Sequence, residues 1–122
     1  MDIALLGGTG DIGEGLALRW AADTDHAVIV GSREAGKAEN AAEEYGAELD
    51  GHGTAIEGVE NADAAARADV VVVAVPAYHP THTVEAVADH LREAILVSPA
   101  VGMKHDEGGF HYNPPRVGSG TE

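Results

Sequence analysis

Residues 3–13 read Ile3-Ala4-Leu5-Leu6-Gly7-Gly8-Thr9-Gly10-Asp11-Ile12-Gly13, a short apolar segment that leads directly into a glycine-rich loop. The glycines at positions 8, 10 and 13 have the spacing Gly-x-Gly-x-x-Gly. In this motif one glycine allows a tight turn, one lets the backbone approach a pyrophosphate, and one lets the next helix pack against the strand. Apolar residues recur at helical spacing after the loop, at Ile12, Leu16, Ala17 and Trp20. This order of strand, loop and helix predicts a dinucleotide site, with the helix N-terminus facing the phosphates.

Apolar runs alternate with helix-forming segments along the rest of the chain. The valines at 70–73 form the clearest strand, which should be central and is stopped by Pro76. We expect strands at 2–6, 27–31, 53–56, 69–75 and 94–98, and helices at 12–22, 35–45, 62–66 and 81–91. With right-handed crossovers, this series gives an α/β fold of the Rossmann type: a doubly wound parallel sheet of strand order 3-2-1-4-5 within three αβα layers.

The length of 122 residues predicts a single folded domain. We expect residues 1–101 to form the Rossmann domain. Residues 102–122 shift to Gly, Pro, His and polar residues, and we expect them to form a loop tail.

The composition is strongly acidic, with 21 Asp and Glu against 7 Lys and Arg and a formal net charge of -14. Such a charge disfavours nucleic acid or an anionic membrane as a partner. It favours a protein of a high-salt cytoplasm over an ordinary soluble acidic protein. The chain has no cysteine, which excludes disulfides and thiolate chemistry. It shows no signal peptide, and its longest apolar run, 70–76, is too short to span a membrane, so we expect a cytoplasmic protein.

The end of the second expected strand indicates which dinucleotide is bound. Sites for NAD usually carry an Asp or Glu there, whereas this chain has Gly31-Ser32-Arg33. Arg33 offers the fork of donors that a 2′-phosphate needs, Ser32 adds a hydroxyl, and Lys37 follows one helical turn later. NADP is therefore the predicted ligand. The alternative, that Ser32 is only a cap and Lys37 only a solvated lysine, stays open, and Glu34 is expected to point elsewhere.

Further cofactor contacts are expected where strands end, because ligands of such sheets lie beyond the carboxyl ends of the strands. Val75 and Pro76 end the fourth expected strand, and Ser98-Pro99-Ala100 ends the fifth, so both should line the nicotinamide side. Glu57-Gly58 should end the third strand and border the same crevice.

The whole pattern resembles a known family. The quoted motifs are the stretch from Ala4 to Arg19, Val30-Gly31-Ser32-Arg33 with Lys37 and Ala38, Val75-Pro76 with His79, and Val97-Ser98-Pro99. Together they are similar to the NADPH-dependent reductases of coenzyme F420, a deazaflavin hydride carrier, of a haloarchaeal-like type. Members of that family are about twice as long, so the resemblance implies the N-terminal, NADP-binding part, with the C-terminal half apparently absent.

The resemblance implies a role for each matching residue. Gly8, Thr9, Gly10, Asp11 and Ile12 would hold the pyrophosphate, Ser32, Arg33 and Lys37 the 2′-phosphate, and Val75 and His79 the nicotinamide side, while Gly58 could approach the deazaflavin. The implied chemistry is direct hydride transfer between nicotinamide C4 and deazaflavin C5. That chemistry demands no side-chain acid or base, so no catalytic residue is named.

Two other functions stay open: an NADP-binding regulatory module without turnover, and a carbonyl reductase, for which a Tyr-x-x-x-Lys pair is missing. The histidine pairs His79/His82 and His105/His111 lack a four-ligand metal spacing, so no metal site is expected. Among other residues, we expect Asp11 to cap the first helix, Tyr45 to cap the end of the second, and Trp20 to join the core. An exposed fifth strand would allow self-association as a homodimer.

Overall fold

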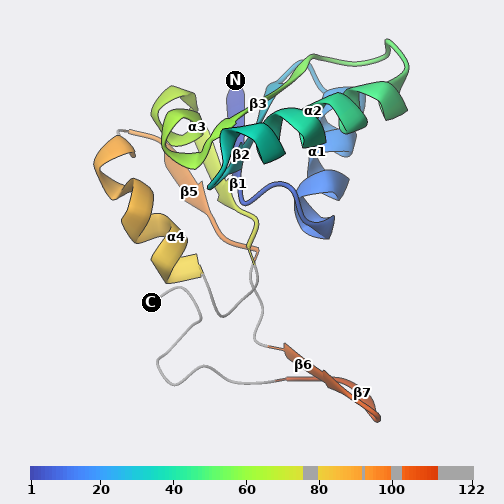
Figure 1. The fold of residues 1–122 in the computed structure, drawn as a ribbon, viewed down its shortest axis with the longest axis vertical. Coiled ribbons are helices and arrows are strands. Elements are labelled where there is room, and N and C mark those ends of the chain that lie inside the picture. The colour runs from blue at the N-terminus through green and yellow to red at the C-terminus, as the bar shows by residue number, and fades with distance from the viewer. Residues whose placement is uncertain (76–79, 92, 100–102, 113–122) are drawn as a thin grey trace.

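The computed structural model describes residues 1–75, 80–91, 93–99 and 103–112. Its centre is a five-stranded sheet of order β3-β2-β1-β4-β5 in which every neighbouring pair is parallel. Figure 1 shows this sheet between the helices. The strands are β1 (Asp2–Leu6), β2 (Ala27–Ser32), β3 (Ile56–Glu60), β4 (Val70–Val73) and β5 (Ile95–Val97). The predicted strand order and parallel pairing are confirmed.

Helices cover both faces of this sheet. They are α1 (Asp11–Asp23), α2 (Ala35–Leu49), α3 (Asn61–Arg67) and α4 (Pro80–Val87), which continues into a 3-10 turn at Ala88–His90. In β1, Ile3 and Leu5 pack with α1 and α2, whereas Ala4 and Leu6 pack with α3 and α4. This split follows from the strand period of two, which sends successive side chains to opposite faces. The expected three αβα layers are therefore present (Figure 1).

The third strand differs from the prediction, which placed it at 53–56. Gly53 instead has a φ of +79°. The Thr54 hydroxyl donates to the His26 carbonyl, just before β2, and the Thr54 N–H donates to the Ala21 carbonyl in α1, each at 2.7 Å, so this segment is a loop bonded to both. The strand begins at Ile56. Gly58 consequently lies inside β3 rather than at its end, and a Cβ there would overlap the backbone of Ala38 in α2. That glycine lets α2 approach the sheet closely.

Two further differences concern the second helix and the tail. Helix α2 continues to Leu49 rather than ending near Tyr45, and it stops where Asp50 enters the left-handed region at a φ of +48°. The described part of the tail is not a loop but an antiparallel hairpin of β6 (Met103–Asp106) and β7 (Gly109–Tyr112), drawn apart from the large sheet in Figure 1. Glu107 and Gly108 connect the two strands, and Gly109, the first residue of β7, has a φ of +102°.

Strand β5 is an exposed edge. Ile95, Leu96 and Val97 are 64%, 47% and 41% exposed, whereas Val71, Val72 and Val73 of the neighbouring β4 are buried. Within the described ranges, no helix has the length and apolar character needed to cross a membrane.

Candidate functional site

The glycine-rich loop joins β1 to α1 at the carboxyl edge of the sheet, and close packing explains three of its glycines. Gly7 has a φ of +67°, and a Cβ there would overlap the side chain of Val75. A Cβ on Gly8 would lie 2.8 Å from the Leu5 carbonyl oxygen. A Cβ on Gly13 would overlap the backbone of Gly8, so the first turn of α1 rests directly on the loop. Side chains at these positions would push the helix away from the strand.

Gly10 differs from these three glycines. It is exposed, and a Cβ built on it would meet nothing within 4 Å. It occupies the N-cap position of α1 and provides no side-chain cap. The prediction that Asp11 caps this helix is therefore wrong, because Asp11 is already the first helical residue. Thr9, Asp11 and Ile12 are also exposed. The start of α1, where helix N–H groups lack partners within the helix, is thus accessible to an anion.

Hydrogen bonds fix the start of the loop from several directions. The Gly8 N–H donates to the carbonyls of Leu5 at 3.1 Å and Gly31 at 2.9 Å. The Gly7 N–H donates to Oδ1 of Asn61, the first residue of α3, at 3.2 Å. These bonds connect the loop to the end of β2 and to the opposite helical layer.

Tyr45 adds a bond from α2, since its buried hydroxyl donates to the Gly8 carbonyl at 2.9 Å. The prediction that Tyr45 caps the end of α2 is wrong, because the helix continues past it and its side chain lies in the core. Sequence reasoning missed both Tyr45 and Asn61. The signal for Tyr45 was its spacing from Ala38 and Ala41, which places it on the apolar face of α2.

The phenol of Tyr45 stays protonated at neutral pH. Burial raises its pKa above the ordinary value, and the carboxylates of Glu14, Glu44, Glu48 and Asp11 raise it further. Its hydroxyl is therefore held as a donor toward the loop.

The predicted 2′-phosphate residues lie beside the loop at the end of β2. Ser32 is buried, and its Oγ accepts the Glu34 N–H at 3.3 Å. The N-cap of α2 is Glu34 and no side chain caps this helix, so the interpretation of Ser32 as a helix cap is wrong. A hydroxyl that accepts one bond can still donate another. Arg33 is exposed. Lys37 is exposed too, and its Nζ lies 3.3 Å from Oε2 of Glu34. The prediction that Glu34 points elsewhere is therefore wrong, because its carboxylate pairs with Lys37.

The remaining predicted contacts are only partly described. Val75 lies two residues beyond the end of β4 and packs against Gly7, which places it next to the glycine loop. Ser98 follows β5 and is exposed. Pro76, His79 and Ala100 lie outside the described residues. Gly58, predicted near the deazaflavin, faces the backbone of α2, and helix packing accounts for its missing side chain.

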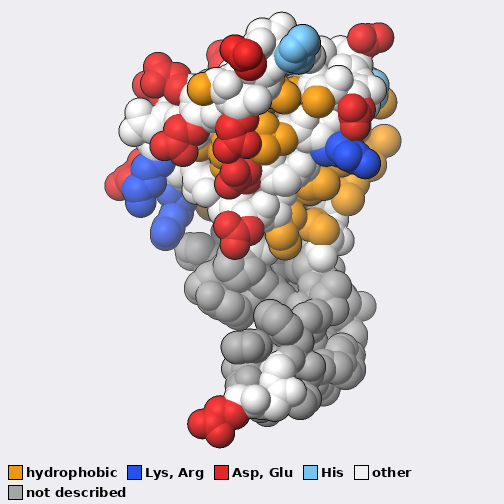
Figure 2. All heavy atoms as spheres, turned by 90° about the vertical axis from the view of Figure 1, so that its right-hand side faces the viewer, with side chains coloured by type: hydrophobic (Ala, Val, Ile, Leu, Met, Phe, Trp, Pro, Cys, Tyr) orange, Lys and Arg blue, Asp and Glu red, His pale blue; other side chains and the backbone are white. Residues whose placement is uncertain are grey.

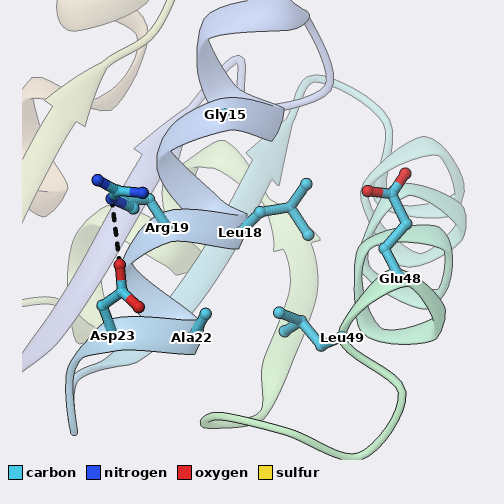
Figure 3. A pocket seen from close by; sticks show the side chains of 7 residues that line it. All are labelled: Gly15, Leu18, Arg19, Ala22, Asp23, Glu48 and Leu49. Atoms are coloured by element: carbon cyan, nitrogen blue, oxygen red, sulfur yellow. Dashed lines mark ion pairs between the residues drawn. The ribbon is translucent and has the colours of Figure 1, made fainter.

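One groove on the described part of the surface is less suited to a phosphate than the glycine loop. Figure 3 shows a groove between α1 and α2, in which Arg19 pairs with Asp23 at 3.1 Å. Carboxylates in the lining oppose a phosphate ligand. The lining residues are Gly15, Leu18, Arg19, Ala22, Asp23, Glu48 and Leu49. Among the described residues, no three His, Asp or Glu side chains gather as metal ligands would. Acidic side chains are scattered over the face drawn in Figure 2.

Comparisons with known proteins agree with this arrangement. The family described as NADP oxidoreductase, coenzyme F420-dependent, matches residues 2–102. An F420-dependent NADP reductase of Methanothermobacter thermautotrophicus is 44% identical over 110 residues, which cover 89% of this chain and 47% of the relative. The reductase of the same name from Methanocaldococcus jannaschii is 42% identical over 105 residues, which cover 84% of this chain and 46% of that protein.

A solved structure supports the same assignment. The crystal structure of a protein assigned as an F420-dependent NADP-reductase from Arthrobacter sp. FB24 has a TM-score of 0.71 and 30% identity, and covers 98% of this chain and 54% of that one. The chain spans about half the length of the relatives it matches. Since the family match covers most of the sequence, the chain belongs to the coenzyme F420-dependent NADP oxidoreductase family.

Proposed function

We propose that this chain binds NADP(H) and serves hydride transfer between NADP(H) and the deazaflavin coenzyme F420. One observation carries the proposal: the bond from the Gly8 N–H to the Gly31 carbonyl joins the glycine loop to the strand end that bears Ser32 and Arg33. A pyrophosphate group and a 2′-phosphate on one dinucleotide would therefore meet neighbouring parts of the same surface. The relatives named F420-dependent NADP reductase support this pairing of substrates.

The described residues fit the dinucleotide. The open space at Gly10 and the exposed first turn of α1 leave room for a pyrophosphate, which Thr9, Asp11 and Ile12 would border. Arg33, Lys37 and the Ser32 hydroxyl would hold the 2′-phosphate, because charged donors form the stronger hydrogen bonds to phosphate. The segments after β4 and β5 would border the nicotinamide, with contacts from Val75, Pro76, His79, Ser98 and Ala100.

When bound, NADP(H) and the deazaflavin exchange the hydride between their own rings, at C4 and C5 respectively. The chain's contribution is to bind the dinucleotide, orient it and exclude water. We further propose that the protein is cytoplasmic and does not bind nucleic acid, since its net charge of -14 repels polyanions. Residues 1–101 would form the NADP-binding unit.

Binding is tested with Arg33→Ala, using Arg19→Ala as the matched control because Arg19 is exposed and pairs with Asp23 away from the loop. Arg33→Ala should weaken NADP+ binding by about 2 kcal/mol, the scale of a lost charge-assisted contact, and should leave NAD+ binding nearly unchanged. Arg19→Ala should change neither affinity. Equal losses for both nucleotides in Arg33→Ala would refute the role of Arg33.

Turnover is tested by mixing the chain with NADPH and oxidised coenzyme F420 in high salt and following the visible absorbance of the deazaflavin. Loss of that absorbance, dependent on both NADPH and protein, supports the enzymatic proposal. Tight NADPH binding without any reduction of the deazaflavin would instead support the non-catalytic NADP-binding module.

A further inference from the structure

The Tyr45 hydroxyl contacts the glycine loop from the hydrophobic core. Tyr45 is only 3% exposed and packs with Leu5, Val30 and Ala41 in the core on the α1 and α2 side of the sheet. Its hydroxyl donates to the carbonyl oxygen of Gly8, 37 residues earlier in the chain, at 2.9 Å in a buried setting. Gly13 of α1 lies directly over the same peptide, because a Cβ there would overlap Gly8 atoms. The Gly8 carbonyl is therefore enclosed and points toward Tyr45.

This bond fixes the direction of the next N–H group. The Gly8 carbonyl and the Thr9 N–H belong to one peptide unit, and in a planar trans peptide they point in opposite directions. The structure contains no cis peptide among its described residues. A carbonyl held inward by Tyr45 thus turns the Thr9 N–H outward, to the exposed side of the loop where α1 begins.

The opposite orientation would oppose an anionic ligand. Rotation of the Gly8–Thr9 peptide would present a carbonyl oxygen, which carries partial negative charge, to the place proposed for the pyrophosphate. Glycine resists such a rotation less than other residues because it has no Cβ. The bond to Tyr45 opposes the rotation, because a carbonyl turned outward would break this bond and leave the buried Tyr45 hydroxyl without its acceptor.

We propose that Tyr45 is a positioning residue for the dinucleotide, which acts through the Gly8–Thr9 peptide by keeping the Thr9 N–H directed at the pyrophosphate. The inference rests on the proposed NADP(H) binding and adds to it a residue that lies in the core and touches no cofactor. Asn61 supports the same loop two peptide units earlier, through the Gly7 N–H.

The test compares two ligands on Tyr45→Phe, which keeps the ring and removes the hydroxyl. NADP+ would contact both the glycine loop and the predicted 2′-phosphate residues Ser32, Arg33 and Lys37. Adenosine 2′-monophosphate has the 2′-phosphate but no pyrophosphate, so it would contact only the second set. Tyr45→Phe should bind NADP+ about tenfold more weakly, the effect of one hydrogen bond of about 1.4 kcal/mol, and should bind adenosine 2′-monophosphate as wild type does. General damage to the fold would weaken both ligands equally.

Thr54→Val is the matched control, because it also removes a hydroxyl that donates to a backbone carbonyl. That carbonyl belongs to His26, and Thr54 lies in the segment before β3 rather than in the glycine loop. It should lower the unfolding midpoint to a similar degree and leave NADP+ affinity intact. Unchanged NADP+ affinity in Tyr45→Phe, or equal losses for the two ligands, would overturn the inference. Failure of the wild-type chain to bind NADP+ would instead overturn the proposed function together with it.

A measurement on the wild-type chain keeps the test independent of how the variant folds. In a nitrogen-15 amide spectrum, NADP+ should move the Thr9 amide proton downfield as it forms a hydrogen bond to the pyrophosphate. Adenosine 2′-monophosphate should leave the Thr9 signal unchanged and should shift the amide signals of residues around Arg33. A Thr9 signal that does not respond to saturating NADP+ would overturn the inference.

Discussion

Gly13→Ala tests the claim that α1 rests directly on the glycine loop. A Cβ at this position would lie closer than 3.0 Å to the Cα, C and O atoms of Gly8. These are backbone atoms, held by the Gly8 N–H bond to Gly31 and by the Tyr45 hydroxyl, so they cannot move aside as a flexible side chain could. We therefore expect α1 to shift away from β1.

The expected magnitude combines two opposing effects. Overpacking of a well-packed site costs about 1–3 kcal/mol, and the rigid neighbours favour the upper half of that range. Replacing glycine by alanine within a helix returns roughly 0.5–1 kcal/mol. Gly13→Ala should therefore lower the free energy of unfolding by about 1–2.5 kcal/mol.

Gly15→Ala is the matched control on the same helix. Gly15 is exposed, and a Cβ there would meet nothing within 4 Å. Only the higher helix propensity of alanine then acts, so Gly15→Ala should be more stable than wild type by roughly 0.5–1 kcal/mol. The same substitution two residues apart is thus expected to change stability in opposite directions.

The assay is urea unfolding of the three proteins in the same high-salt buffer, followed by titration with NADP+. Gly13→Ala should also bind NADP+ more weakly, because its helix N-terminus moves relative to the loop, whereas Gly15→Ala should bind as wild type does. A Gly13→Ala protein as stable as Gly15→Ala would refute the close contact on which the site geometry depends.

Two further predictions concern charged pairs. Glu34→Gln should strengthen NADP+ binding about two- to fivefold, because Lys37 loses a competing carboxylate. Calorimetry should show no gain in affinity for NAD+. An equal gain for NAD+ would show that the effect does not involve the 2′-phosphate. Arg67→Met should lower the free energy of unfolding by at most about 1 kcal/mol at neutral pH, because both partners of the pair are largely exposed. The Arg67 guanidinium holds the pKa of Glu57 below its ordinary value, so the pair stabilises the fold above that value and its contribution is lost as the pH falls through the lowered pKa. Urea unfolding should therefore show the difference at neutral pH and a smaller one at about pH 3, and a difference that grows in acid would refute the assignment.

The sequence predicted the central sheet well because its signals are local. The apolar strands β1, β2 and β4 and the turn glycines identify themselves within a few residues, and the rules for parallel sheets then order them. The third strand was misplaced because Ile56–Glu60 contains glycine and two glutamates and lies at an edge, where apolar alternation is weak.

The site was predicted less completely, since some of its parts depend on contacts between distant residues. The Tyr45 hydroxyl reaches Gly8 across 37 positions, and Asn61 reaches Gly7 across 54. No spacing rule encodes such contacts. The pairing of Glu34, the N-cap residue of α2, with Lys37 three residues later follows helix geometry and could have been predicted.

We propose that this chain distinguishes NADP from NAD through the residues at the end of β2. Calorimetric titration of the wild-type chain with NADP+ and with NAD+, in one buffer at one salt concentration, measures this preference. We expect NADP+ to bind at least about tenfold more tightly, as one charge-assisted contact to the 2′-phosphate would give. Equal affinities, or tighter binding of NAD+, would show that these residues do not select the 2′-phosphate.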